Sequence, residues 1–344
     1  MALPLTEPAA ATLAHGALDV GLVGIGVHLP DEVVTNADWE ATLDTSDEWI
    51  VERTGIRERR RAPEGEATSD LAVAAATAAL KDAGLEASDL GAVVVATTTP
   101  DHIIPQTAPI VADRLGILAP AFDVGAGCTG FVYGLAVAGG LVSSGVADPV
   151  LLVGAETLTR VIDPTDRNTA VLFGDGAGAV VLAGGEGEIG PFDLGADGSL
   201  VDLLVVPAGG TRRPASPATL EAGAHTLDMR GREVYRHAVT RMAASSRAVL
   251  DRAGLTVDDV DLLVGHQANA RILDAVARRL GIADDRAFLV VDRYGNTSAA
   301  SIPIALHDAL VEGRLQRGSR VLLTAFGAGV TWGSCLLTWE GGRG

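Results

Sequence analysis

Cysteine and lysine are scarce in this chain of 344 residues, and aromatic side chains make up only 4% of it. The two cysteines, Cys128 and Cys335, cannot build a disulfide framework, and no cysteine and histidine cluster has the spacing of a zinc site. We therefore expect a protein of the reducing cytoplasm with no bound metal. Lys81 is the only lysine, so arginine carries nearly all of the positive charge.

The chain also lacks a recognisable segment for export or membrane insertion. Residues 1–17 are rich in alanine and proline and contain no lysine or arginine, so they lack the basic start of a signal peptide. We interpret them as a loose N-terminal extension. The longest apolar run, residues 131–142, is interrupted by glycines and is too short to cross a bilayer. These absences predict a soluble protein that has no membrane partner.

Negative charge dominates the composition, with a formal net charge of −18. Such a chain is a poor candidate for binding nucleic acid or an anionic membrane surface. Hydrophobic residues make up 48% of the sequence, which is ample for a large core. By length alone, the chain could form two domains.

An internal repeat divides the chain in two. Residues 80–90 align without gaps to residues 250–260, at an offset of 170 positions, and each stretch precedes an apolar strand pattern. An offset close to half the chain length indicates one α/β unit that occurs twice in tandem. We therefore divide the chain into an N-terminal extension (1–17), an N-terminal half (18–188) and a C-terminal half (189–344).

Strand and helix patterns alternate within each half. Continuous apolar runs at 92–98 and 150–155 predict strands that are buried on both faces. The alanine-rich stretch 69–83 predicts a helix, and a further strand is expected at 288–291. This alternation indicates a layered α/β architecture.

Cys128 is the first candidate for chemistry. A predicted strand runs into Gly125–Gly127, then Cys128, then a predicted helix from residue 129. A thiol at a helix N-terminus lies near unpaired N–H groups and the positive end of the helix dipole, which favour the thiolate. The alternative is a packed core cysteine, which is common in proteins.

Two polar residues, His266 and Asn296, are further candidates for the same site. One is indicated by its position after a predicted strand and the other by the internal repeat. His266 directly follows a predicted strand, at the edge where α/β folds place their sites. At an offset of 168, Asn296 falls opposite Cys128, although an asparagine before a helix is also a common N-cap. Cys128, His266 and Asn296 together supply a nucleophile, a hydrogen-bonding base and a neutral donor, which suits acyl transfer.

Two glycine clusters invite a dinucleotide-binding interpretation that their context does not support. The cluster Gly174–Gly178 leads into a strand pattern, whereas a phosphate cradle requires a helix at that point. The glycines at 21, 24 and 26 likewise precede no helix. We expect both to be places where backbones pack closely.

A series of motifs resembles the β-ketoacyl-acyl carrier protein synthase III family of the thiolase-like superfamily. The resemblance covers residues 18–341 without a large gap. It rests on the segments DEWI (47–50), RTGI (53–56), AGCTGF (126–131), DPTDR (163–167), GDGAG (174–178), HQAN (266–269), GNTSAAS (295–301) and FGAG (326–329).

The resemblance implies a thiolase-like five-layered αβαβα fold of two pseudo-symmetric halves, assembled as a homodimer. Cys128 would take an acyl group from acyl-CoA while the backbone N–H groups of Cys128 and Ala328 hold the oxyanion. His266 and Asn296 would then bind the malonyl thioester oxygen of malonyl-acyl carrier protein during decarboxylation. The resulting enolate would attack the acyl-cysteine, and no cofactor would be needed.

The resemblance also assigns binding residues. Trp49 and Arg167 match the pair that sandwiches the CoA adenine, although a tryptophan is also common in a core. Arg53 and Asn269 match other CoA-contacting positions. The acyl pocket would be formed by Ile104, Met229, Tyr235 and Phe326.

Ile104 departs from the phenylalanine of the best-known member, at a position that reaches across the dimer interface into the partner's pocket. The acidic carrier protein would dock on a basic patch. Arg271, Arg278 and Arg279 recur at spacings of seven and eight residues, which places them on one helical face. Arg236 matches a further family position for this contact.

Two other functions are alternatives to condensation. The first is a thiolase-fold acyltransferase that moves an acyl group to oxygen or nitrogen, against which Asn296 argues. The second is a non-catalytic partner subunit, against which the presence of Cys128 argues. The sequence leaves open the acyl group and whether the product enters fatty acids or a polyketide.

Overall fold

A computed structural model describes residues 16–341, so most of the expected N-terminal extension lies outside the described residues. The N-terminal half contains β1 (Leu18–His28), β2 (Glu32–Thr35), α1 (Asn36–Glu40), α2 (Asp47–Thr54), β3 (Glu58–Arg61), α3 (Thr68–Ala83), β4 (Ala92–Ala96), α4 (Thr107–Arg114), β5 (Ala121–Val124), α5 (Gly130–Ser143), β6 (Val150–Thr157) and β7 (Asp175–Ala196).

The C-terminal half then adds β8 (Leu204–Val205), α6 (Pro217–Glu221), β9 (Asp228–Met229), α7 (Gly231–Ala253), β10 (Leu262–Gly265), α8 (Ala270–Leu280), α9 (Val291–Tyr294), α10 (Ser301–Val311), β11 (Ser319–Gly327) and β12 (Thr331–Trp339). No helix among residues 16–341 has the length and hydropathy to span a membrane.

The repeat in the sequence recurs in the strand pairing. β4 pairs in parallel with β6, and β6 pairs antiparallel with β7. In the second half, β10 pairs in parallel with β11, and β11 pairs antiparallel with β12. Helices α3 and α5 precede the two parallel strands of the first unit, as α7 and α10 precede those of the second. The fold is therefore built from two copies of one α/β unit.

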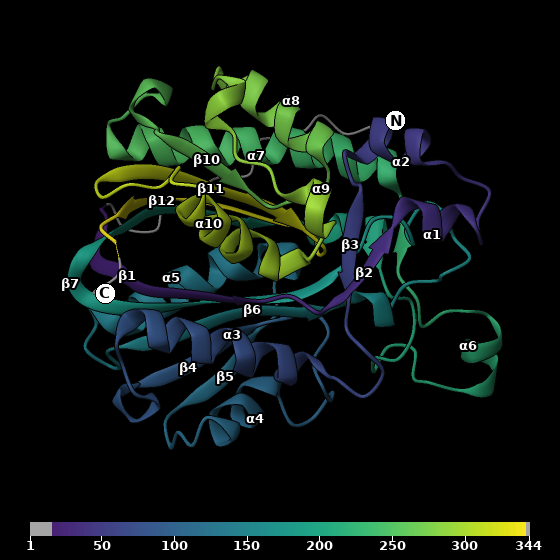
Figure 1. Cartoon of the computed structure of the whole chain (residues 1–344), viewed down its shortest axis with the longest axis horizontal. Helices are drawn as coiled ribbons and strands as arrows, with labels where there is room; N and C mark the ends of the chain where they lie inside the picture. Colours follow the sequence, from purple (N-terminus) through teal and green to yellow (C-terminus); the bar gives the residue numbers. More distant parts are fainter. Residues whose placement is uncertain (1–15, 342–344) are drawn as a thin grey trace.

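Five layers stack in the order αβαβα (Figure 1). Helices α3 and α4 bury alanine, leucine and valine side chains against β4 and β6 on one outer face. Helices α7 and α8 cover β10 to β12 on the opposite outer face. Helices α5 and α10 lie between the two sheet regions and pack against both. The five-layered thiolase-like fold expected from the sequence is confirmed.

The two sheet regions are joined through one long strand. β7 spans 22 residues, and its first part pairs with β1 and β6 while its last part pairs with β12. All eight strands of this system therefore belong to one hydrogen-bonded sheet. The predicted boundary between the N-terminal and C-terminal halves, at residues 188 and 189, falls inside β7. The division of the chain into two halves at this point stays a prediction.

The prediction of a strand at residues 288–291 is wrong. Only a single bridge, between Leu263 and Ala287, forms there, and α9 begins at Val291. The Gln267 side chain explains the difference, because it donates to the Phe288 carbonyl at 3.1 Å and accepts the N–H of residue 290 at 2.8 Å. These are backbone groups that a strand would pair with its neighbours.

Candidate active site

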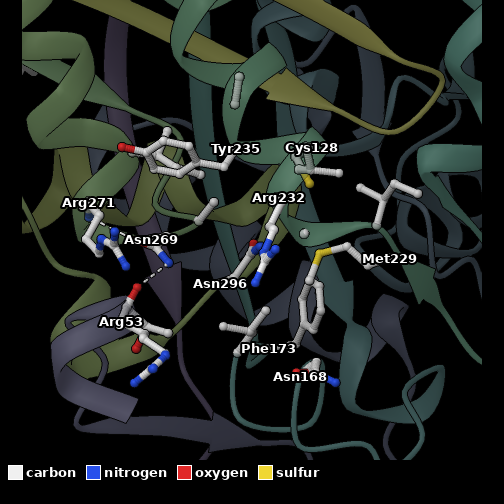
Figure 2. Close-up of a pocket in the computed structure, with 18 of the residues that line it drawn as sticks. Arg53, Cys128, Asn168, Phe173, Met229, Arg232, Tyr235, Asn269, Arg271 and Asn296 are labelled. Carbon is white, nitrogen blue, oxygen red and sulfur yellow. Dashed lines mark hydrogen bonds between the residues drawn. The ribbon is translucent and has the colours of Figure 1, made fainter. Parts of the chain in front are cut away.

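One cavity of about 830 Å³ brings together the three residues of the predicted catalytic set. Cys128, His266 and Asn296 all line it, with side chains from α7, α8 and β9 completing the wall. Figure 2 shows the Cys128 sulfur and Asn296 facing the same space. In the described part of the chain, no group of three or more histidine, cysteine or acidic residues is placed to hold a metal.

A tight backbone contact positions Cys128. It lies in a 3-10 turn, Gly127–Thr129, between β5 and α5. Gly127 has φ +57°, and a Cβ there would lie 2.8 Å from the Ala328 nitrogen. A Cβ on Gly327 would lie 2.5 Å from the Cys128 nitrogen. Only glycine permits this approach, which brings the segment Gly127–Cys128 into close contact with the segment Gly327–Ala328. Ala328 itself is not among the lining residues.

The thiol of Cys128 is protonated in the resting chain. Burial raises its pKa to about 12, a change opposed only in part by hydrogen bonding from Ser298. The expectation that the helix start favours the thiolate is therefore wrong here, because desolvation of the charge outweighs the nearby amides. The helix α5 itself begins two residues later, at Gly130. Cys335 is completely buried in β12, and burial raises its pKa further.

His266 is held as a neutral imidazole. Its backbone N–H donates to the Thr324 carbonyl at 2.8 Å, which fixes it just beyond β10. Its Nδ1 lies 2.7 Å from the Ser301 hydroxyl oxygen, which accepts the N–H of Gln267 at 3.3 Å. If Ser301 donates to Nδ1, the ring proton stays on Nε2, which can then donate into the cavity. Burial lowers the pKa of His266 to about 3.

Asn296 presents its amide nitrogen to the cavity. Its backbone N–H donates to the Leu172 carbonyl at 2.8 Å, and its own carbonyl accepts the N–H of Gly174 at 3.0 Å. The side-chain Oδ1 accepts the N–H of Ser298 at 2.9 Å. Because Oδ1 is occupied in this way, Nδ2 is the group left to donate to a ligand.

Comparisons with known proteins agree with this geometry. Family profiles described as 3-oxoacyl-[acyl-carrier-protein (ACP)] synthase III and its C-terminal part match residues 122–198 and 250–339. A β-ketoacyl-[acyl-carrier-protein] synthase III of Streptomyces coelicolor is 54% identical over 323 residues, covering 92% of this chain and 96% of the relative. The chain belongs to the β-ketoacyl-acyl carrier protein synthase III family.

Solved structures of this synthase III family extend the likeness to three dimensions. The 3-oxoacyl-(acyl carrier protein) synthase III of Pseudomonas aeruginosa PAO1 superposes with a TM-score of 0.87 at 49% identity, covering 94% of this chain and 98% of the other. The priming β-ketosynthase of the R1128 polyketide pathway reaches the same TM-score at 34% identity, covering 96% and 99%. A protein named for a polyketide pathway therefore shares this fold with one named as a 3-oxoacyl-(acyl carrier protein) synthase III.

Three of the four residues matched to CoA binding in the synthase III family line the cavity, namely Trp49, Arg53 and Asn269. The guanidinium carbon of Arg53 lies 4.5 Å from the centre of the Trp49 ring, and that of Arg167 lies 5.0 Å from it. The Asn269 amide donates to the Arg53 carbonyl at 2.9 Å (Figure 2). Arg167 does not line the cavity, and it donates to the Asp44 carbonyl at 2.6 Å.

The Trp49–Arg167 pair is thus closed in this structure. A ring sandwiched between two planar groups needs about 3.5 Å on each side, or about 7 Å between them. The observed 5.0 Å leaves no room for an adenine. Adenine binding between them would require Arg167 to move outward by about 2 Å.

Three of the four residues matched to the acyl pocket line the cavity, namely Met229, Tyr235 and Phe326. Ile104 does not, and its side chain is 86% exposed on the loop before α4. The exposed side chain is free to contact a second subunit, and the role of Ile104 in a partner's acyl pocket stays a prediction.

The sequence interpretation missed Arg232 and Phe173, which also line the cavity. Arg232 lies three residues after Met229 and three before Tyr235, so helical spacing from Tyr235 could have indicated it.

The four predicted docking arginines divide into two groups. Arg271 lines the cavity, and its guanidinium carbon lies 6.0 Å from the centre of the Tyr235 ring. Arg236, Arg278 and Arg279 are exposed and lie outside the cavity. Helices α7 and α8 pack against each other, so all four arginines belong to one pair of adjacent helices, both of which contribute side chains to the cavity wall.

Proposed function

We propose that this chain is a β-ketoacyl-acyl carrier protein synthase III that joins an acyl group to a malonyl unit with loss of carbon dioxide. The acyl group passes from acyl-CoA to Cys128, and malonyl-acyl carrier protein then replaces CoA. The products are 3-oxoacyl-acyl carrier protein, carbon dioxide and CoA. One observation carries this proposal: a thiol, a neutral imidazole and a free amide donor face the same cavity.

The first half-reaction uses the backbone around Cys128. Its sulfur attacks the thioester carbonyl, and the carbonyl oxygen becomes negative. The amides of Cys128 and Ala328 belong to two backbone segments in close contact, and they would donate to that oxygen. Removing one donor of this kind typically costs about 10²–10³ in rate.

The second half-reaction uses His266 and Asn296 as donors. Loss of carbon dioxide from the malonyl group leaves an enolate whose oxygen carries negative charge. His266 Nε2–H and Asn296 Nδ2–H would stabilise it, and its carbon then attacks the acyl-cysteine. The lowered pKa of His266 suits this role, because the ring can donate without becoming charged. No cofactor takes part.

We propose a cytoplasmic homodimer in which Ile104 of each subunit closes the partner's acyl pocket. Isoleucine is smaller than phenylalanine, so this pocket would accept acyl groups longer or more branched than acetyl. Trp49, Arg53, Arg167 and Asn269 would hold CoA at the entrance. The acidic carrier protein would dock on Arg236, Arg271, Arg278 and Arg279, since complementary charge accelerates association even where the total charge is negative.

A two-stage assay tests the proposal. Wild type is incubated with a panel of acyl-CoAs and malonyl-acyl carrier protein, and the mass of the carrier-protein product is measured. Asn296→Ala should still acylate Cys128 but lose condensation by about 10²-fold or more. Condensation at the wild-type rate in this variant, or acyl transfer to an oxygen or nitrogen acceptor, would favour the acyltransferase alternative. A protein that acylates nothing would favour the non-catalytic one.

A further inference from the structure

A buried arginine that the proposed reaction does not use lies in β3. Arg59 is only 1% exposed, and none of the ion pairs among residues 16–341 includes it. Burial lowers its pKa to about 10, so the group stays charged near neutral pH. A buried cation without a carboxylate partner is costly, because its charge has left water and has no counterion.

The guanidinium group of Arg59 joins two parts of the chain through neutral acceptors. Its Nη1 donates to the Val34 carbonyl in β2 at 3.1 Å and to the Asn36 side-chain oxygen at 2.9 Å. Its Nη2 donates to the Val171 carbonyl at 2.6 Å, across 112 positions of sequence. Arg59 therefore ties the paired strands β2 and β3 to the segment that begins at Val171.

That segment, residues 171–174, holds the backbone of Asn296. The Leu172 carbonyl accepts the Asn296 N–H at 2.8 Å, and the Gly174 N–H donates to the Asn296 carbonyl at 3.0 Å. The carbonyl that Arg59 binds belongs to the residue directly before Leu172. The guanidinium group thus fixes the chain one residue away from a backbone partner of Asn296.

The stem of the Arg59 side chain packs against the same place. A Cβ on Gly174 would lie 3.1 Å from the Arg59 Cβ, and a Cβ on Gly295 would lie 3.1 Å from it as well. Gly295 directly precedes Asn296, with φ +63°. Arg59 is therefore in close contact with both segments that the backbone bonds of Asn296 join.

The backbone next to Arg59 also holds the helix before Asn296. The Arg57 N–H donates to the Asp292 carbonyl in α9 at 3.0 Å, and β3 runs beside α9 in Figure 1. β3 and the residue before it therefore contact the chain on both sides of Asn296. A displacement of about 1 Å at a group that meets the substrate can cost about 10²-fold in rate.

We propose that Arg59 is a positioning residue that holds the Asn296 amide where it meets the enolate oxygen. Arg59 does not line the cavity, so it acts through the backbone of residues 171–174 and 295. The planar guanidinium fork donates in two directions at once, whereas an apolar side chain would leave its three acceptors without a donor. This inference rests on the proposed function, in which Asn296 acts in the condensation step.

The test measures the two half-reactions separately in Arg59→Met, which keeps the stem and loses the charge and the donors. Single-turnover acylation of Cys128 by acyl-CoA gives the first rate. Condensation of the isolated acyl-enzyme with malonyl-acyl carrier protein gives the second. Arg286→Met is the matched control, because Arg286 also donates to two backbone carbonyls, those of Val257 at 3.1 Å and Val260 at 3.0 Å, and does not line the cavity.

Arg59→Met should condense about 10²-fold more slowly than wild type and should acylate Cys128 at nearly the wild-type rate. Arg286→Met should leave both rates unchanged. Adding Arg59→Met to Asn296→Ala should lower condensation by no more than about twofold, because Arg59 acts through an amide that this background lacks. A purely structural role would instead multiply the two losses.

Three results would overturn the proposal: wild-type condensation in Arg59→Met, an equal fall in its acylation and condensation rates, or a further loss of about 10²-fold in the double variant. Should Arg59→Met fail to fold, Arg59→Lys decides by the same two rates, since it keeps the charge and lacks the fork. If wild type is not acylated on Cys128, or its acyl-enzyme yields no 3-oxoacyl-acyl carrier protein, the proposed function fails instead.

Discussion

Acidification should destabilise this protein through His266, and the size of the effect can be worked out. In the unfolded chain a histidine has a pKa of about 6.5. Inside the fold, burial lowers the pKa of His266 to about 3. Between these two values the unfolded state binds a proton that the folded state does not. Stability is therefore complete above the unfolded pKa and falls as the pH drops from there toward the folded pKa.

The magnitude follows from linkage. Each pKa unit corresponds to about 1.36 kcal/mol, so at pH ~5, about 1.5 units below the unfolded pKa, His266 costs about 2 kcal/mol. The comparison variant is His266→Asn, which has no ionisable group and retains a polar atom near Ser301. All other titrating groups are common to both proteins.

Urea unfolding at about pH 7.5 and about pH 5, at one fixed protein concentration, measures the difference. Wild type should lose about 2 kcal/mol more than His266→Asn between these conditions. Equal losses would mean that His266 accepts a proton inside the fold as readily as in the unfolded chain. That result would refute the inference that burial keeps the ring neutral.

Three further predictions concern selectivity, docking and the oxyanion site. Ile104→Phe should lower turnover of branched or medium-chain acyl-CoA relative to acetyl-CoA, since one methylene is worth roughly 1–3 kcal/mol in a fitted pocket; an unchanged ratio would assign the pocket floor elsewhere. Arg278→Glu should raise KM for malonyl-acyl carrier protein at low salt and leave Cys128 acylation unchanged. The control Arg317→Glu, at the opposite end of β11 from Gly327, should change neither quantity. If both variants had the same KM for malonyl-acyl carrier protein, the docking surface would lie elsewhere. Gly327→Ala should slow acylation by at least about 10²-fold, because its Cβ would force the Cys128 amide to shift; wild-type acylation would contradict the close contact.

Local patterns were sufficient to predict the repeat and the catalytic set. The gapless match between residues 80–90 and 250–260 reflects a helix and the turn after it, whose geometry is set by nearby residues. Cys128, His266 and Asn296 each stand beside glycine or directly after a strand, and such signals are readable from a few positions.

Properties that depend on distant contacts were not predictable. The pKa of Cys128 follows from burial among several elements, so the helix-start argument gave the wrong direction. The strand at 288–291 is replaced because the Gln267 side chain occupies its backbone groups.

The most direct measurement of the central claim is the mass of the Cys128 peptide through one reaction cycle. After incubation with acyl-CoA, wild type should carry one acyl group on Cys128, and Cys128→Ala should carry none although Cys335 remains. Adding malonyl-acyl carrier protein should remove that acyl group and produce carrier protein bearing its 3-oxoacyl derivative. Equal labelling of Cys128→Ala, or an acyl group on Cys128 that malonyl-acyl carrier protein does not discharge, would contradict the account.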